Sequence, residues 1–393
     1  MLTVCRSWTS LKRVLFCWEL GANFGHLALA GWLRDRLPAD AWDIVYAVTD
    51  LRAARQFLGP EARLVQSPVW PPQRFQGAIV GPVSQVDVLA MLGFHNTAQL
   101  ATMIAAWRTL FALIEPDILV ADHSPTVSLA ARIEQRPLIA TGTPFTMPPL
   151  GYPTFPPLRG DLAPALPEHR MQAAIDAALR EHGYAASLPT LPSYFASQAR
   201  IVIGLPELDP YRSFRQDQLF APPGGFPPLL PIPERRLFAY LGSETPDLPT
   251  VLQAICALDF PVELFVRGAD DFTLEFVRLS GKTLHIDMAD LRQTLPAVSH
   301  VISQGGAATT AMTLAAGRPH MMLPMHHEAR LNAAMIERMG AGFEAKTSFE
   351  ARLADFVGDY GLQESAAAAA NVLSQRPLPD SGDRLIEAVT ALL

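Results

Sequence analysis

The chain has few cysteines, which excludes a fold held together by disulfides. Of its 393 residues only Cys5, Cys17 and Cys256 are cysteines; they are odd in number and far apart. Such usage is typical of a protein kept in a reducing compartment, where thiols stay free. We therefore expect a cytoplasmic protein whose cysteines act as small buried hydrophobic residues.

The sequence also lacks an excess of positive charge and a long apolar run. Lys and Arg number 31 against 38 Asp and Glu, a formal net charge of −7. No nucleic-acid partner is expected, because binding to a phosphate backbone relies on basic side chains. No uninterrupted apolar run reaches the roughly 18 residues of a membrane span. The apolar residues after Arg13 are interrupted at Glu19 with no cleavage site following, which favours a first strand over a signal peptide.

What the sequence does contain is enough apolar material for a large core. Hydrophobic residues make up 49% of the chain and charged residues 18%, which excludes global disorder. Apolar strands alternate with amphipathic helices in two halves, separated by a proline-rich stretch at residues 221–233. This pattern predicts an α/β protein with two doubly wound domains, at 1–220 and 234–380, followed by a helix at 381–393.

The alternation locates the individual elements. In the first half it predicts strands at 14–18, 43–48, 62–66, 117–121, 137–141 and 200–203, and helices at 26–37, 52–58, 86–114, 125–134 and 168–182. In the second half it predicts strands at 237–241, 262–266, 283–286, 299–303 and 321–323, and helices at 250–258, 272–279, 290–297, 307–316 and 329–339. In a doubly wound sheet of order 3-2-1-4-5, the first and fourth strands are neighbours.

The most informative stretch is residues 301–342. A buried strand runs into the glycine pair Gly305-Gly306, and a helix of small residues follows at once. Glycine at a strand-to-helix turn lets a ligand approach the backbone closely, and the free N–H groups of the helix start favour an anion. A diphosphate is the obvious candidate ligand, although a glycine pair that only makes a tight turn is a common alternative.

This stretch resembles the donor-binding signature of family 1 glycosyltransferases of the GT-B fold, the UDP- or dTDP-sugar-dependent group that includes macrolide and antibiotic glycosyltransferases. The residues in register with that signature are Gly305, Gly306, Thr309, Gly317, Pro319, Pro324, Asn332, Ala333, Gly340 and Gly342. The resemblance implies two Rossmann-like domains facing across a cleft, the first for the acceptor and the second for the nucleotide sugar. It also implies a last helix that crosses back onto the first domain, and no metal or cofactor besides the nucleotide diphosphate sugar as co-substrate.

The chain departs from the signature at several positions. Gln304 stands where the family has a phosphate-binding His, and Ala308 replaces a Gly. The Gln304 amide can donate one hydrogen bond to a phosphate but carries no charge. Met312 replaces a Glu that holds ribose hydroxyls, which favours a dTDP-sugar. Glu328-Ala329 replaces an Asp-Gln pair that holds sugar hydroxyls, which favours a deoxysugar such as rhamnose.

His26 and Asp122 are the predicted catalytic residues. His26 begins the first helix, and its imidazole has a proton affinity suited to a general base near neutral pH. Asp122 ends the fourth strand, so the topology brings both side chains to one crevice, where a carboxylate can fix the imidazole tautomer. The Gly-His pair at 25–26 and the Val-Ala-Asp segment at 120–122 also resemble family motifs. The alternative is that His26 merely caps its helix and that Asp122 is the N-cap of the next.

The resemblance assigns donor binding to the second half of the chain. The glycine turn would meet the diphosphate, together with the serine that follows the first strand of this half. A methionine would cradle the base, and polar residues near 328 would approach the sugar. These donor-binding residues are Ser243, Met288, Gln304, Gly305, Gly306, Thr309, His327 and Glu328. A metal site at His326-His327-Glu328 is not expected, because adjacent histidines rarely bind one ion together and no third ligand is visible.

Apolar residues in the loops of the first half predict the acceptor pocket. They would line a hydrophobic pocket with few polar groups, as small-molecule sites usually do. The predicted acceptor-binding residues are Asn23, Phe24, Trp70, Phe94 and Phe145. For the aromatic residues among them, a small core beneath a loop is an equally good alternative.

Together these features predict an inverting glycosyltransferase that acts on a hydroxyl of a hydrophobic small molecule or lipid. One alternative is a catalytically silent relative that binds a ligand or activates a partner enzyme, because several donor-binding residues are replaced. Another is a GT-B nucleotide-sugar epimerase, which would have no use for a His–Asp base pair. The sequence leaves the acceptor, the sugar, the oligomeric state and a peripheral membrane contact open.

Overall fold

The computed structural model describes residues 11–21, 25–71, 81–160, 162–346 and 348–393. The chain divides into two compact units. Unit 1 contains residues 1–203, 211–223 and 380–393, and unit 2 contains residues 204–210 and 224–379. Compared with the expected ranges, residues 204–210 cluster with the second unit instead of the first, and the proline-rich stretch is divided after Pro223.

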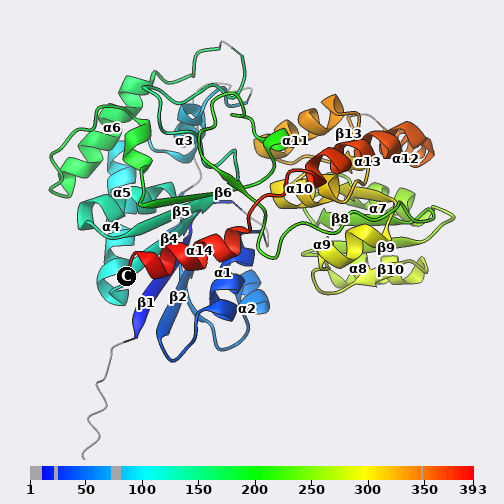
Figure 1. The fold of residues 1–393 in the computed structure, drawn as a ribbon, viewed down its shortest axis with the longest axis horizontal. Coiled ribbons are helices and arrows are strands. Elements are labelled where there is room, and N and C mark those ends of the chain that lie inside the picture. The colour runs from blue at the N-terminus through cyan, green and yellow to red at the C-terminus, as the bar shows by residue number, and fades with distance from the viewer. Residues whose placement is uncertain (1–10, 22–24, 72–80, 161, 347) are drawn as a thin grey trace, which may run out of the picture. The chain divides into compact units, whose positions relative to one another are not determined.

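Unit 1 is built on a seven-stranded parallel sheet (Figure 1). Its strands are β1 (Lys12–Trp18), β2 (Trp42–Val48), β3 (Arg63–Gln66), β4 (Ile118–Asp122), β5 (Leu138–Gly142), β6 (Ala199–Ile203) and β7 (Leu219–Phe220). The order is β3-β2-β1-β4-β5-β6-β7, which confirms that the first and fourth strands are neighbours. Strands β4 and β5 are buried along their whole length, as expected for central strands of a sheet that is covered on both faces.

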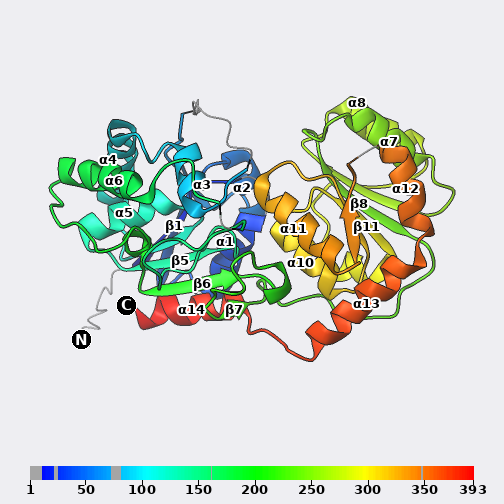
Figure 2. The same cartoon turned by 90° about the horizontal axis from the view of Figure 1, so that it is seen from above.

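Helices cover this sheet on both faces. They are α1 (Gly25–Arg36), α2 (Leu51–Leu58), α3 (Gln85–Leu92), α4 (Thr97–Ile114), α5 (Pro125–Glu134), α6 (Glu168–Glu181) and α14 (Ser381–Ala391), with a 3₁₀ turn, η1 (Pro192–Phe195). Helices α4, α5 and α6 pack together on one face, and α1 packs with α14 on the other (Figures 1 and 2).

The stretch 86–114 is mostly helical, as predicted, and the chain forms two helices there, α3 and α4. Gly93 adopts a left-handed φ of 107° after α3, and its N–H bonds back to the carbonyl of Leu89. The N–H of Phe94 bonds to the same carbonyl, which closes the helix. Asn96 then caps α4, its side chain accepting from the Gln99 N–H at 3.2 Å.

Helix α4 alone among the described helices has the length and hydropathy of a membrane span. Its apolar residues recur at helical spacing, and Leu100, Ile104, Trp107 and Phe111 are fully buried in the core of unit 1. Core helices of this kind pass the same test of length and composition, so the finding is weak evidence for a membrane contact.

Unit 2 is built on a six-stranded parallel sheet of order β10-β9-β8-β11-β12-β13. Its strands are β8 (Leu237–Gly242), β9 (Val262–Arg267), β10 (Thr283–His285), β11 (His300–Ser303), β12 (His320–Met322) and β13 (Gly342–Glu344). Its helices are α7 (Leu248–Cys256), α8 (Asp271–Leu279), α9 (Leu291–Thr294), α10 (Ala307–Ala315), α11 (His327–Arg338), α12 (Phe349–Gly358) and α13 (Tyr360–Ser374), with the 3₁₀ turns η2 (Pro206–Leu208) and η3 (Leu295–Ala297). The elements β13, α12 and α13 had no counterpart in the sequence prediction.

The two sheets confirm the predicted fold class. Every pairing between the named strands is parallel. In parallel sheets the carboxyl ends of the strands lie along one edge, and ligands of open α/β sheets bind there. The loops after β1, β4 and β5 in unit 1, and after β8, β9 and β11 in unit 2, are therefore where a site is expected.

The last helix, α14, packs within unit 1 against α1 and β6. Asp380 caps it by accepting from the N–H groups of Gly382 at 2.7 Å and Asp383 at 3.0 Å. Gly382 lies directly against the indole of Trp32, since a Cβ built on this glycine would overlap the ring. Close packing of a backbone on an aromatic ring therefore fixes where the helix lies.

We predict that Gly382→Val destabilises the protein by about 2 kcal/mol, because an added side chain would push α14 away from Trp32. The measurement is denaturant unfolding followed by tryptophan fluorescence. Glu387→Val is the matched control, since Glu387 is exposed on the same helix. Equal losses of stability in the two variants would contradict the packing assigned to Gly382.

Candidate active site

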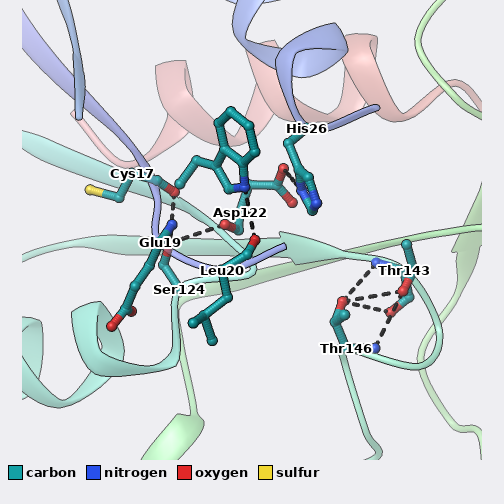
Figure 3. A network of polar contacts seen from close by, with 9 residues as sticks. Cys17, Glu19, Leu20, His26, Asp122, Ser124, Thr143 and Thr146 are labelled. Atoms are coloured by element: carbon teal, nitrogen blue, oxygen red, sulfur yellow. Dashed lines mark hydrogen bonds and ion pairs between the residues drawn. The ribbon is translucent and has the colours of Figure 1, made fainter. Parts of the chain in front are cut away.

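The predicted pair of His26 and Asp122 is formed in the structure. The Nδ1 atom of His26 lies 2.9 Å from Oδ2 of Asp122 (Figure 3). Strands β1 and β4 are adjacent in register, with Trp18 opposite Asp122, so the loop after β1 carries α1 and its imidazole back over the carboxylate. The Asp122 side chain is 5% exposed and that of His26 18% exposed. Because an ionised carboxylate only accepts, Nδ1 carries the proton and Nε2 of the neutral ring is an acceptor.

The surroundings of His26 hold the ring and bring a glycine against Nε2. The imidazole stacks on Trp18, with ring centroids 5.0 Å apart, and on His123, with centroids 6.0 Å apart. Gly21 lies beside Nε2, because a Cβ built on it would be 2.6 Å from that nitrogen. Gly21 also has a φ of 88°, a backbone conformation that residues with a side chain rarely adopt. A side chain at this position would collide with Nε2, so the packing around the ring requires a glycine.

The alternative role of Asp122 as a helix cap is not the one that the structure gives it. The N-cap of α5 is Ser124, and that helix has no side-chain cap. Ser124 instead links the two strands: its Oγ accepts from the Glu19 N–H at 2.9 Å and lies 2.9 Å from the Cys17 carbonyl (Figure 3). Ser124 thereby ties the end of β1 to the end of β4.

A buried carboxyl supports this part of the site. Glu19 is 4% exposed, and its side chain accepts from the Trp70 indole N–H at 2.7 Å and from the Thr126 N–H at 3.1 Å. Loss of hydration raises the pKa of Glu19 to about 7, although these hydrogen bonds oppose the shift. In the sequence pattern Glu19 only interrupts an apolar run, and this role was missed there.

A pocket opens in unit 1 at the ends of β4 and β5, next to the His26–Asp122 pair. Its walls come from α3, the start of α5 and the loop after β5; they include Gln85, His123, Thr141, Met147 and Phe155. Two residues of the lining carry a buried oxygen with no hydrogen-bond partner among the described residues, Oε1 of Gln85 and Oγ1 of Thr141. Buried polar atoms are nearly always paired in native proteins, so two unpaired oxygens on residues of one pocket point to a polar ligand group.

The described residues among the predicted acceptor set, Trp70, Phe94 and Phe145, do not line this pocket. Phe94 is a correction: it is fully buried in the core of unit 1 and stacks on Trp70, because the closure of α3 at Gly93 turns its ring inward. Trp70 is partly buried and packs against that core, and its indole N–H donates a hydrogen bond to Glu19. Phe145 is 9% exposed. Asn23 and Phe24 lie outside the described residues.

In unit 2 the two glycines of the predicted diphosphate turn differ in environment. Gly305 has a φ of 75°, and its N–H is taken by Oγ of Ser303 at 3.0 Å, so it does not offer this donor to a ligand as predicted. Ser303 lies in turn 2.8 Å from Nε2 of His320, whose pKa is lowered to about 3 by burial. Asn332 also donates to the Gly305 carbonyl at 3.0 Å. Ser303 and His320, which the motif does not include, therefore fix the turn.

Gly306 is the glycine that faces open space. A Cβ built on it would meet no atom within 4 Å. It is the N-cap of α10, and no side chain caps this helix. The first N–H groups of a helix have no intrahelical partner, and together with the helix dipole they attract an anion. Thr309, in the first turn of α10, is 8% exposed.

The other predicted donor-binding residues lie at the carboxyl edge of the same sheet. Gln304 donates to Glu244 at 3.3 Å and to Thr245 at 3.2 Å. Ser243 is exposed directly after β8, and Met288, 39% exposed, follows β10. His327 and Glu328 are partly buried in the first turn of α11. No group of three or more His, Cys, Asp or Glu side chains suited to a metal ion occurs within the described ranges.

Comparisons with known proteins were made for sequence and for fold. No protein-family model matches the chain. A PGL/p-HBAD biosynthesis glycosyltransferase of Mycobacterium tuberculosis is 28% identical over 321 residues, which cover 75% of this chain and 72% of that protein. The structure of the spinosyn rhamnosyltransferase SpnG matches with a TM-score of 0.64 and 17% identity, over 96% of this chain and 100% of that one. The glycosyltransferase VinC in complex with dTDP matches with a TM-score of 0.62 and 15% identity, over 97% and 99%.

These comparisons confirm the resemblance that the motif indicated. The chain has the GT-B fold, and its structural neighbours are macrolide and antibiotic glycosyltransferases. The prediction of a glycosyltransferase-type enzyme is confirmed in the same way, since the proteins matched by sequence and those matched by fold are both named glycosyltransferases.

We predict that the stability cost of an ionised Glu19 appears only as the pH rises. The pKa of about 7 in the folded state lies above the ordinary value of 4.5, so folding favours the protonated form. The protonated Glu19 therefore contributes to the free energy of unfolding in full below pH 4.5. This stabilisation, up to about 3 kcal/mol, is lost as the pH rises through 7.

The measurement is the free energy of unfolding of wild type and Glu19→Gln at pH 5 and pH 8. The variant should gain stability relative to wild type at the higher pH, because its amide stays neutral. Glu181→Gln, which removes an exposed carboxyl of the same unit, is the control. A difference between wild type and Glu19→Gln that does not change with pH would contradict the prediction.

Proposed function

From the GT-B fold and its glycosyltransferase relatives, we propose that this protein transfers a sugar from a nucleoside diphosphate sugar to a hydroxyl of a hydrophobic small molecule or lipid. The transfer is a single displacement that inverts the configuration at the anomeric carbon. His26 acts as the general base and Asp122 orients it. The observation that carries the proposal is the 2.9 Å hydrogen bond between these side chains, which makes Nε2 the acceptor nitrogen of the neutral ring.

In this reaction the acceptor oxygen attacks the anomeric carbon as the bond from that carbon to the diphosphate oxygen breaks. The acceptor proton passes to Nε2 of His26, and the negative charge leaves on the diphosphate. Asp122 stabilises the imidazolium that forms, since its carboxylate already accepts from Nδ1. A base whose proton affinity lies near the working pH is the efficient choice for such a transfer.

Unit 2 would hold the donor. The uncapped start of α10 supplies backbone N–H groups to the departing diphosphate, and Gly306 leaves open space there. Met312 stands where related enzymes carry a ribose-binding Glu, which favours a dTDP-sugar, and Ala329 removes a side-chain amide near the sugar, which favours a deoxysugar. The names of two structural neighbours support this choice, because one is a rhamnosyltransferase and another is bound to dTDP.

The pocket in unit 1 would hold the acceptor. Its lining is mainly apolar, with Leu89, Met147 and Phe155 among its residues, which suits the body of a hydrophobic molecule. The orphaned oxygens of Gln85 and Thr141 would receive a second hydroxyl of that molecule, away from the one that reacts. The acceptor is therefore a hydrophobic compound with at least two hydroxyl groups.

The alternative of a catalytically silent binding or activator protein draws on the replaced residues Gln304, Met312 and Ala329. It gives no reason for a buried carboxylate to fix the tautomer of an imidazole at the carboxyl end of the sheet. A nucleotide-sugar epimerase would likewise have no use for that pair or for an apolar pocket. The His26–Asp122 pair thus favours transfer over both alternatives.

We predict that His26→Ala lowers the release of nucleoside diphosphate from a dTDP- or UDP-sugar by about 10²–10⁴-fold, because water, the default acceptor, loses its general base. Asp122→Asn should lower the rate at least tenfold while leaving binding of the nucleoside diphosphate unchanged. His169→Ala, on the exposed face of α6, is the matched control. Unchanged release in His26→Ala would exclude the proposed mechanism.

We predict that Thr141→Val, an isosteric change, removes discrimination between acceptors that differ by one hydroxyl. Wild type should use an aromatic diol about tenfold better than the matched mono-alcohol, because one hydrogen bond contributes roughly 1–1.5 kcal/mol. The measurement is kcat/KM for both acceptors in wild type, Thr141→Val, Gln85→Leu and the exposed control Thr109→Val. Discrimination that survives in both pocket variants would contradict the assigned role of the pocket.

A further inference from the structure

Three side chains meet at the carboxyl edge of the sheet in unit 2. Arg267 is the last residue of β9, Glu244 lies two residues after β8, and Gln304 directly follows β11. These three strands are adjacent in the order β9-β8-β11, so the side chains converge although they are far apart in sequence. Of the three, the donor-binding signature includes the position of Gln304 alone.

The carboxylate of Glu244 is the centre of this cluster. Its Oε1 accepts a hydrogen bond from Nη2 of Arg267, and the same oxygen accepts from the side-chain amide of Gln304 at 3.3 Å. The carboxylate folds back over the end of β8, because a Cβ built on Gly242 would overlap both of its oxygens. The Glu244 side chain is 44% exposed, so it can leave this position without disturbing the core.

The donors around this carboxylate are those that a diphosphate needs. Carboxylate and phosphate oxygens accept the same charge-assisted hydrogen bonds from a guanidinium. Within the described part of the chain, the Nε atom of Arg267 is buried without a hydrogen-bond partner, so the guanidinium is not fully paired in the free protein. Gln304 supplies an uncharged N–H, and the cluster therefore depends on Arg267 for its positive charge.

Resting on the proposed function, we propose that the Glu244 carboxylate occupies the place of a diphosphate oxygen in the free protein, and that Arg267 and Gln304 transfer their hydrogen bonds to the donor's diphosphate when it binds. Arg267 then compensates the charge of the leaving group where the related signature has a histidine. Glu244 is an internal competitor that weakens binding of any anion at this edge. The competing explanation is that the Arg267–Glu244 ion pair only fixes the loop after β8.

The test measures binding of dTDP, UDP and inorganic diphosphate to the full chain by titration calorimetry. Glu244→Gln keeps the shape of the side chain and removes its charge, so we expect about tenfold tighter binding of all three ligands. Arg267→Gln should weaken their binding at least tenfold. Glu275→Gln and Arg278→Gln alter an exposed ion pair on α8 of the same unit and serve as charge-matched controls with unchanged affinities.

The outcomes separate this inference from the proposed function. If wild type binds a nucleoside diphosphate and Glu244→Gln binds it no more tightly, the internal competitor is excluded while the donor class stands. If neither protein binds any nucleoside diphosphate, both proposals are wrong. Because Arg267→Gln is the variant more at risk of misfolding, its thermal unfolding is measured alongside, and the comparison of wild type with Glu244→Gln is the decisive one.

Discussion

The pairing of β1 with β4 is the constraint on which the candidate site of unit 1 depends. It places Trp18 opposite Asp122 and so brings together two side chains that are 96 residues apart. Ser124 and the buried Glu19 reinforce the same junction through hydrogen bonds that cross from one strand end to the other. The imidazole of His26, in the first turn of α1, is therefore held beside Asp122 at the carboxyl end of β4.

The strands of unit 1, their order and the contact between His26 and Asp122 could be predicted from the sequence, because the sheet is parallel. Central strands that are buried on both faces are continuous apolar runs, and the doubly wound order then fixes which strand ends are neighbours. The pair of His26 and Asp122 follows from those two facts. Phe94 does not, because its position depends on the left-handed turn at Gly93, and an aromatic residue after a helix end can face inward or outward with equal ease.

The rest of the site could not be predicted because it is built from contacts between distant segments. The pocket joins α3 to the ends of β4 and β5, and its orphaned atoms on Gln85 and Thr141 become apparent only when every neighbour is in place. The glycine turn of unit 2 is similar. The motif includes both Gly305 and Gly306 and does not distinguish them. In the structure Oγ of Ser303 accepts the hydrogen bond of the Gly305 N–H, whereas Gly306 faces open space.

The proposed base in unit 1 and the proposed diphosphate contacts in unit 2 differ in how far they tolerate substitution, and this bears on the replaced residues of unit 2. A general base must sit at one place relative to the attacking oxygen, so in the proposed mechanism a base elsewhere in unit 1 could not replace His26. Charge on a diphosphate is spread over several oxygens and can be met by any donor that reaches them. A neutral Gln304 is then compatible with catalysis, provided that a cation such as Arg267 lies at the same edge. Loss of signature residues in unit 2 is therefore weaker evidence against activity than loss of the His–Asp pair would be, and that pair is intact.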